Sequence, residues 1–265
     1  MKKPVSLLLI TLALFISTLT LIASSPATAQ ARKLRIGVEG AYPPFSELGT
    51  DGKIKGFDID IANALCEQMK AQCTLVQQEF DGMIPSLQAK KLDAIIASMS
   101  ITDERKQVIE FSDKYYHTPA RFVGKKNAAL AATTAGMKGK RIGVQRTTTH
   151  DRFATDTFTE SEIVRYAKQD DVFLDLTSGR LDAVLVDQVA ASQGFFLLPA
   201  GKEFAFFGPV YMEPKYFGYG AGIGMRKTDT ALRDEFNAAI KAIRANGVYK
   251  KINDKYFRFD VYGGK

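Results

Sequence analysis

LRIGVEGAY, residues 34–42, begins with a short strand-like run that ends at Val38, and a carboxylate, Glu39, and a glycine, Gly40, follow it. Its Arg-Ile-Gly-Val core recurs at residues 141–144, where Gln145 follows. A second pattern, Leu-Asp-Ala, occurs at residues 92–94 and again at 181–183 after a basic stretch each time. Short strand-like runs that alternate with longer helical patterns are typical of α/β folds. The two repeated patterns therefore predict two similarly wound βαβ lobes.

Apolar periodicity assigns the same alternation of strands and helices to both halves of the chain. We expect an α/β architecture with largely parallel sheets. The expected strands are 34–38, 74–78, 92–97, 141–144, 163–166, 181–186 and 220–225. The expected helices are 57–69, 83–90, 151–157, 172–177, 231–244 and 248–257.

The tail of the chain, from about residue 219, does not extend the second lobe. If the chain crosses back to the first lobe near Phe217-Gly218-Tyr219, two strands join the lobes as a hinge, and a cleft lies between them. We therefore expect four segments: a signal peptide at 1–29, the first part of lobe 1 at 30–117, lobe 2 at 118–218, and a return to lobe 1 at 219–265.

The N-terminus has the layout of a cleavable secretory signal. Lys2 and Lys3 precede an apolar run at 5–22, and Ala27-Thr28-Ala29 fits an A-x-A cleavage site. A single membrane anchor is the alternative, because the run approaches the length of about 20 residues that spans a bilayer. No cysteine follows the run, which disfavours a lipid anchor. The expected location of the mature protein is the periplasm.

Charge and composition exclude several classes of protein. Cleavage would lower the basic residues from 36 to 34 against 29 acidic ones, without a basic block that would indicate nucleic-acid binding. We find no G-x-S-x-G, H-E-x-x-H or phosphate-loop motif, and only two histidines. We therefore expect no enzymatic activity, no cofactor and no metal.

The chain has two cysteines, Cys66 and Cys73, seven positions apart. In an exported protein such a close pair indicates a local disulfide between a helix end and the next strand. Two free buried thiols are the alternative. A metal site is disfavoured, because neither His117 nor His150 is near the pair in sequence.

Polar and aromatic residues follow the predicted strands at the edge where open α/β sheets bind ligands. They offer two acids, two arginines, two aromatic faces, hydroxyl groups and helix-starting amides. The candidate ligand-binding residues are Glu39, Tyr42, Phe80, Ser98, Met99, Ser100, Arg105, Gln145, Arg146, Thr148, Thr149, His150 and Asp187.

This set suits an amino-acid zwitterion. An arginine and free N–H groups bind the carboxylate, and one acid binds the ammonium. A second acid beside two aromatic faces suits a cationic side chain, through a charge pair and cation–π contacts of about 0.5–2 kcal/mol each. Each residue also has a purely structural interpretation. For example, Ser100-Ile101-Thr102-Asp103 has the pattern of a helix N-cap, and Tyr42 and Phe80 could be core residues.

The mature chain resembles the periplasmic polar amino-acid binding proteins of ABC transporters, in the lysine/arginine/ornithine and arginine/ornithine branch. The resemblance covers essentially all of it and depends on five motifs. They are GFDID at 56–60, FDGMIPSL at 80–87, SMSITDER at 98–105, DLTSGRLD at 175–182 and KYFG at 215–218.

The resemblance implies a role for several residues. Arg105 and the backbone of Ser100 and Thr149 would hold the ligand carboxylate. Asp187 and Ser98 would take the α-ammonium, and Tyr42 and Phe80 would sandwich the side chain. Glu39 stands where the family often has aspartate for the distal charge. A Cys66–Cys73 disulfide is also implied.

Three positions depart from the family pattern. Ala97 replaces a frequent serine, Thr147 replaces a frequent glycine, and Tyr219 lies where relatives usually carry an acid. The expected partners are a cationic amino acid (arginine, ornithine or lysine) and an inner-membrane ABC permease, with the protein itself a monomer. The alternatives are a periplasmic dehydratase-like enzyme, a histidine- or opine-binding receptor, and the sensing domain of a receptor.

Overall fold

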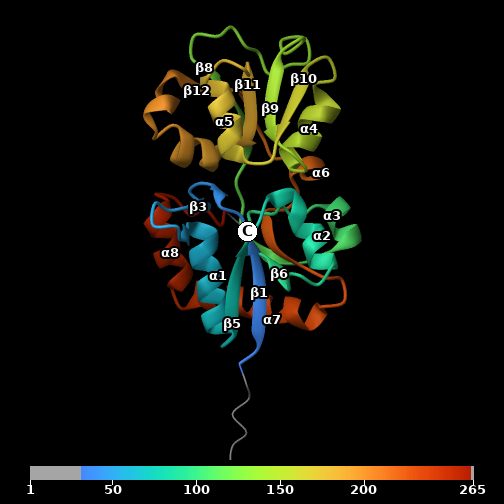
Figure 1. The fold of residues 1–265 in the computed structure, drawn as a ribbon, viewed down its shortest axis with the longest axis vertical. Helices are drawn as coiled ribbons and strands as arrows, with labels where there is room; N and C mark the ends of the chain where they lie inside the picture. Colours follow the sequence, from blue (N-terminus) through green and yellow to red (C-terminus); the bar gives the residue numbers. More distant parts are fainter. Residues whose placement is uncertain (1–30, 264–265) are drawn as a thin grey trace, which may run out of the picture. The chain divides into compact units, whose positions relative to one another are not determined.

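A computed structural model describes residues 31–263, so the expected signal peptide lies outside the described residues. The described chain forms two lobes, each built on a five-stranded sheet (Figure 1). Among residues 31–263, no helix has both the length and the hydropathy needed to cross a membrane.

Lobe 1 contains both ends of the described chain, since the red C-terminal helices contact the first helix of the chain (Figure 1). Its strands are β1 (Lys33–Val38), β2 (Ala41–Tyr42), β3 (Ser46–Leu48), β4 (Ile54–Lys55), β5 (Gln72–Gln77), β6 (Ala94–Ile95), β7 (Glu110–Tyr116) and β13 (Ala221–Met225). Its helices are α1 (Phe57–Gln68), a 3-10 turn at Phe80–Gly82, α2 (Met83–Gln88), α3 (Asp103–Val108), α7 (Thr230–Ala245) and α8 (Val248–Tyr256).

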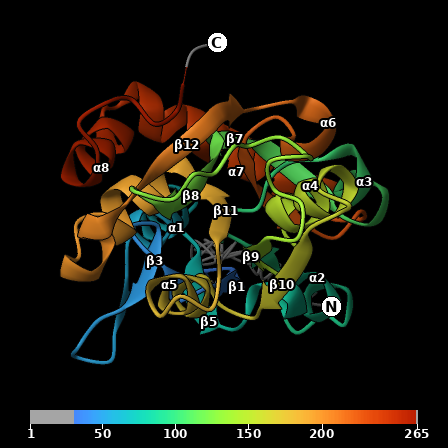
Figure 2. The same ribbon diagram turned by 90° about the horizontal axis from the view of Figure 1, so that it is seen from above.

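Lobe 2 is formed by the middle of the chain. Its strands are β8 (Ala120–Lys125), β9 (Arg141–Gln145), β10 (Glu162–Tyr166), β11 (Ala183–Asp187) and β12 (Phe204–Tyr211). Its helical segments are α4 (Thr149–Thr157), α5 (Gln169–Thr177), a π-helix at Ala190–Phe195, a 3-10 segment at Pro199–Glu203 and α6 (Pro214–Phe217). Helices α4 and α5 lie on opposite sides of the sheet (Figure 2).

The two sheets share one topology. Their strand orders are β5-β1-β6-β13-β7 and β10-β9-β11-β8-β12. In each sheet the fourth strand, β13 or β8, runs antiparallel to both of its neighbours. The sheets are therefore mixed rather than largely parallel as expected. The two antiparallel strands, β8 and β13, are the first strands that the chain forms after it crosses between the lobes.

The sequence echoes mark equivalent contacts in the two lobes. An added Cβ on Gly37 would lie 2.5 Å from Leu92, and one on Gly143 would lie 2.3 Å from Leu181. Each glycine therefore lets the leucine of the Leu-Asp-Ala pattern pack against the strand backbone.

The neighbouring arginine and aspartate of the two patterns also pair. The Arg35 guanidinium donates to Asp93 at 2.9 and 3.0 Å, and the backbone N–H of Arg141 donates to Asp182 at 2.8 Å. Each arginine lies in the first strand of its lobe, β1 or β9. Each aspartate directly precedes a neighbouring strand, β6 or β11. The repeated sequence patterns therefore form the same packing contact in both lobes.

The chain crosses between the sheets twice, at residues 117–119 and 212–220. Gly218, with φ of +70°, packs against the carbonyl of Ile101, which also accepts from the N–H of Tyr219 at 3.0 Å. The lobe boundaries expected at 117/118 and 218/219 fall in these stretches and stay a proposal.

The disulfide joins Cys66 in α1 to Cys73 in β5, with Cα atoms 6.2 Å apart. It connects the end of a helix to the strand that follows, as the resemblance implied. This excludes the two free thiols that spacing alone had left open.

We expect Gly143→Ala to lower the free energy of unfolding by about 1–3 kcal/mol, because the added methyl overpacks against Leu181 and Val172. Urea unfolding followed by circular dichroism measures this. Gly82→Ala is the control, since its nearest contact would be Gln78 at 3.4 Å and its φ is −83°. Equal effects of the two substitutions would contradict this account of the repeated glycine.

Candidate functional site

A cavity lies between the facing strand ends of the two lobes. It consists of two hollows that share five lining residues, Tyr42, Ser98, Ser100, Thr149 and His150. Each hollow measures about 30 Å³, which holds no more than one or two waters. An organic ligand therefore enters only when the lobes or the lining side chains move apart.

One hollow ends at Glu39. It is further lined by Phe80, Ala97, Arg105, Gln145 and Thr148. The other ends at Asp187. It is further lined by Tyr116, His117, Thr118, Ala120, Phe217, Gly220 and Ala221.

Glu39 follows β1, is 4% exposed and accepts a hydrogen bond of 2.6 Å from the side-chain amide of Gln145. Gln145 is the equivalent residue at the end of β9, so this bond joins the two lobes. Burial raises the pKa of Glu39 to about 8; the hydrogen bond from Gln145 opposes the rise, and Asp58, Asp170 and Asp81 add to it. A cationic group in this hollow would favour the ionised carboxylate.

Asp187 ends β11 at the opposite side of the cavity and is 7% exposed. It accepts hydrogen bonds from the Thr118 hydroxyl and from the N–H groups of Val189 and Ala190, the last two at 2.7 and 3.0 Å. Burial raises its pKa to about 6, and these bonds oppose the rise. Asp187 is therefore mostly ionised at neutral pH and suits a cationic group.

Arg105 lies in α3, above the ring of Phe80 at 5.4 Å. Its guanidinium donates to the carbonyl of Ser100 at 3.0 Å and, across the lobes, to that of Thr147 at 3.1 Å. Burial lowers its pKa to about 10, which leaves it cationic at neutral pH. His150 lies nearby, and burial together with Arg105 lowers its pKa to about 3, so its ring is neutral.

Two backbone elements next to Arg105 offer N–H groups. Ser100 pairs with Ala221 in an isolated bridge whose hydrogen bonds come from Ile101 and Gly222, so the Ser100 N–H lies outside the bridge. Thr149 begins α4, where the first N–H groups have no acceptor within the helix. Together with Arg105, these groups have the chemistry to bind an anion.

Ser98 is held by two residues that the sequence analysis did not single out. Its hydroxyl donates to Asp58 at 2.9 Å, and its N–H donates to the Tyr115 hydroxyl at 3.0 Å. The Tyr115 hydroxyl in turn donates to Asp58 at 2.9 Å. Burial raises the pKa of Asp58 to about 7, although the bonds from Ser98 and Tyr115 oppose the rise.

The structure brings eleven of the thirteen candidate residues to the cavity and places two elsewhere. Met99 is 1% exposed and packs in the core of lobe 1. Arg146 forms ion pairs with Glu79 and Asp81. A ligand-binding part for either residue stays a prediction.

Several cavity residues in or next to the crossing segments were not predicted from the sequence, Tyr116, His117, Thr118 and Gly220 among them. The Tyr-Tyr-His-Thr-Pro run at 115–119 was the only signal for the first three. The expected cap also differs, because the hydroxyl that caps α3 belongs to Thr102, which accepts from the N–H of Arg105.

Ion pairs outside the cavity join the lobes. Arg146 of lobe 2 lies 3.1 Å from Glu79 and 2.6 Å from Asp81 of lobe 1. Arg152 of α4 pairs with Glu104 of α3. These side chains are partly exposed, so each pair contributes about 0–1 kcal/mol to closure.

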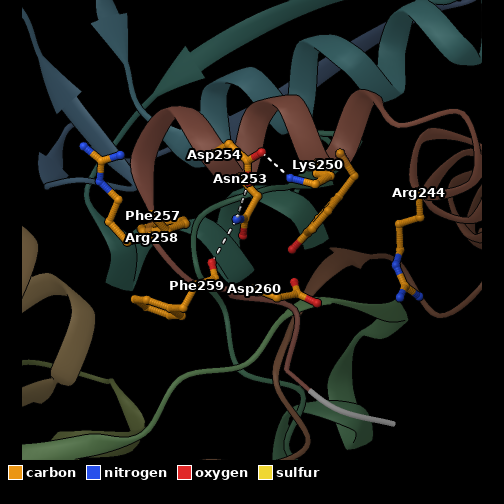
Figure 3. A pocket seen from close by; sticks show the side chains of 9 residues that line it. Arg244, Lys250, Asn253, Asp254, Phe257, Arg258, Phe259 and Asp260 are labelled. Atoms are coloured by element: carbon orange, nitrogen blue, oxygen red, sulfur yellow. Dashed lines mark hydrogen bonds and ion pairs between the residues drawn. The ribbon is translucent and has the colours of Figure 1, made fainter.

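A wider hollow of about 650 Å³ lies at α8 and the C-terminal segment (Figure 3). Two pairs of its lining groups already bind each other. Asn253 donates to the carbonyl of Phe259 at 2.8 Å, and Lys250 pairs with Asp254. No candidate residue lines it, and all its lining residues come from the end of α7, α8 and the segment after it.

Within residues 31–263, no group of three or more His, Cys, Asp or Glu side chains could hold a metal ion. The ionisable side chains at the cavity are two acids, one arginine, histidines and tyrosines. The charged groups therefore complement a small molecule with two cationic groups and one anionic group.

The sequence profile of the family described as "Bacterial extracellular solute-binding proteins, family 3" matches residues 34–259. The chain belongs to this family. Family 3 is a family of binding proteins rather than enzymes, and its two-lobed α/β fold is the one described above.

Similar proteins within family 3 cover nearly the whole chain. The L-arginine-binding protein of Pseudomonas aeruginosa is 54% identical over 244 residues, which cover 91% of this chain and 94% of that protein. The lysine/arginine/ornithine-binding periplasmic protein of Escherichia coli is 46% identical over 265 residues, 99% and 100% of the two chains.

A similar solved structure concerns high arginine specificity in a periplasmic binding protein of Salmonella typhimurium. It has a TM-score of 0.80 and 38% identity, and covers 86% of this chain and 100% of that one.

We expect Arg146→Gln to raise the rate of solute release about two- to tenfold, because the closed form loses its ion pairs to Glu79 and Asp81. Stopped-flow measurement of release at low and high salt tests this, and high salt should shrink the difference. Arg32→Gln is the matched control, since Arg32 pairs with Glu235 inside lobe 1 at similar exposure. An equal change in this control would contradict an interlobe role.

We expect the closed form of the ligand-free protein to become less stable relative to the open form as pH rises from about 4.5 to about 8. Burial raises the pKa of Glu39 from 4.5 to about 8, so the closed form binds more protons in this range. Asp187, with a pKa raised to about 6, acts in the same direction. Small-angle scattering across this range measures closure. Glu39→Gln should flatten the curve above pH 7, and an unchanged curve would exclude Glu39 as its cause.

Proposed function

We propose that this protein is the periplasmic substrate-binding component of an ABC importer and captures a cationic L-amino acid by closing its two lobes. The observation that carries the proposal is the charge of the cavity. Glu39 and Asp187 lie at its two ends, and Arg105 provides its anion site. Arginine, lysine and ornithine carry the complementary charges, two positive and one negative.

The ligand carboxylate is assigned to the Arg105 side of the cavity. A guanidinium and free backbone N–H groups form charge-assisted hydrogen bonds with a carboxylate. Ser100 lies in the loop before α3, while Thr149 begins α4 in lobe 2, so an anion held by both needs both lobes. By contacting both lobes, the ligand carboxylate would stabilise the closed form.

The α-ammonium is assigned to Asp187 and Ser98. Asp187 already accepts three hydrogen bonds, which orient its carboxylate in the cavity wall. A carboxylate has about four lone-pair positions, so one remains for the ligand. Ser98 lines both hollows and therefore lies between Glu39 and Asp187.

The cationic side chain is assigned to the Glu39 hollow, beside Tyr42 and Phe80. Desolvation penalises an ionised Glu39 that has no cationic partner. A guanidinium or ammonium group removes that penalty, whereas a neutral side chain such as that of glutamine does not. This difference favours cationic ligands over isosteric neutral ones.

The similar proteins support the class of ligand, since their names specify arginine in one case and lysine, arginine and ornithine in the other. The periplasmic location agrees with the name of the second. A permease partner and a monomeric state belong to the same proposal. A release assay with reconstituted transporter and a light-scattering mass measurement address them.

Calorimetric titration of refolded, ligand-stripped protein tests the proposal. We expect arginine, lysine or ornithine to bind more tightly than histidine, and glutamine most weakly. Chromatography of the mixture afterwards should return the ligand unchanged, whereas a dehydratase-like enzyme would consume its substrate. Failure of all cationic amino acids to bind would refute the proposal.

We expect Glu39→Gln to weaken arginine about 10- to 100-fold while changing glutamine little, because only the charged tail loses its counter-ion. Asp187→Ala and Arg105→Ala should weaken every amino acid, since both contact groups that all share. Calorimetry with arginine and glutamine on each variant measures this. Equal loss for both ligands in Glu39→Gln would remove Glu39 from the specificity role.

A further inference from the structure

Asp58 is a buried acid that does not line the cavity itself but binds the hydroxyl of Ser98, which does. It lies in the first turn of α1, is 0% exposed and lines neither hollow. Its two oxygens accept from different hydroxyls, Oδ1 from Tyr115 and Oδ2 from Ser98, both at 2.9 Å. The start of a helix stabilises negative charge, which suits a carboxylate at this position.

When Asp58 is ionised, the hydrogen bonds among these residues use the one proton of each hydroxyl. A hydroxyl has one proton, and an ionised carboxylate has none. Tyr115 gives its proton to Asp58 and therefore accepts, at 3.0 Å, from the N–H of Ser98. Ser98 gives its own hydroxyl proton to Asp58. Ser98 thus has no donor left for a ligand.

We infer that Asp58 is a positioning residue: by holding the Ser98 hydroxyl proton, it makes Ser98 Oγ an acceptor only, and so selects the ammonium end of the ligand. The inference rests on the proposed function. Ser98 has a φ of +53° at the end of the segment that follows β6, and this backbone turns both its N–H and its hydroxyl to the Asp58–Tyr115 pair.

Ser100, two residues further on, has the opposite character. Its N–H lies outside the bridge to Ala221, and the guanidinium of Arg105 is bound to its carbonyl at 3.0 Å. This serine therefore belongs to a donor-rich wall, while Ser98 belongs to an acceptor wall. The contrast orients a zwitterion, with its carboxylate at Ser100 and its ammonium at Ser98.

The test compares L-arginine with 5-guanidinopentanoate, which keeps the carboxylate and guanidinium but lacks the α-ammonium. Asp58→Asn keeps the shape of the side chain, but its amide can donate to Ser98 Oγ and occupy the lone pair meant for the ligand. We expect about 10- to 100-fold weaker binding of arginine, the equivalent of one charge-assisted hydrogen bond, and less than about threefold for the analogue.

Two further variants separate positioning from stability. In a Ser98→Ala background, Asp58→Asn should cause no additional loss of arginine affinity, because the residue through which it acts is gone. Asp60→Asn is the matched control. Asp60 lies in the same helical turn but pairs with Lys255 and Tyr256, so it should leave both ligands unchanged. Urea unfolding of each variant verifies that it is folded.

Equal weakening of arginine and its analogue in Asp58→Asn, or additive losses in the Ser98→Ala background, would overturn the inference while leaving the proposed function intact. Wild-type protein that binds no cationic amino acid would instead refute the proposed function. If Asp58→Asn does not fold, the same comparison on Asp58→Glu decides: a longer acid keeps the acceptor but displaces it, and should still weaken arginine more than the analogue.

Discussion

The hydrogen bond from Gln145 to Glu39 joins the two lobes at equivalent points, because each residue directly follows the Ile-Gly-Val core of its own lobe. Its geometry depends on the strands behind it. The Gly37–Leu92 and Gly143–Leu181 contacts set β1 against β6 and β9 against β11, so that the ends of these strands face each other across the cavity. The hydrogen bond from Gln145 does not neutralise the charge of an ionised Glu39. A neutral amide does not remove the cost of burying a carboxylate, as the raised pKa of Glu39 records.

Much of this arrangement could be predicted from the sequence, since the repeated motifs correspond to repeated contacts. Parallel strands connected by helices have their carboxyl ends on one edge, so Glu39, Ser98, Gln145 and Asp187 could be placed together before any coordinates were known. Strands β7, β8 and β12, each of which forms antiparallel pairs, were missed. Residues 110–125 mix charged and aromatic side chains without a clean period, and such strands are formed through pairing with neighbours distant in the sequence.

Site residues whose own side chains can contact a ligand could be predicted from the sequence. A residue that acts on the ligand only through a neighbouring residue could not. Asp58 was visible only as a letter in a motif, since nothing in the sequence indicates that α1 brings it under Ser98. Residues 116–118 contact the cavity because the chain crosses there, which is a consequence of topology. Conversely, Met99 lies between two site residues in the sequence, but it is buried in the core of lobe 1 while Ser98 and Ser100 line the cavity.

In the proposed function, the cavity discriminates between ligands by the polar and charged groups that it leaves without a partner. Its donors gather at Arg105, Ser100 and Thr149, and its acceptors at Asp187, Ser98 and Glu39, so a ligand inserted in the reverse direction would set like groups against each other. Reversal is costly because each unpaired buried group loses about 1–3 kcal/mol, and more if charged. Interlobe ion pairs such as Arg146–Asp81 are exposed to solvent and cannot supply comparable selectivity. In the proposed function, these ion pairs shift the balance between open and closed forms equally for every ligand, whereas the buried acids would distinguish one ligand from another.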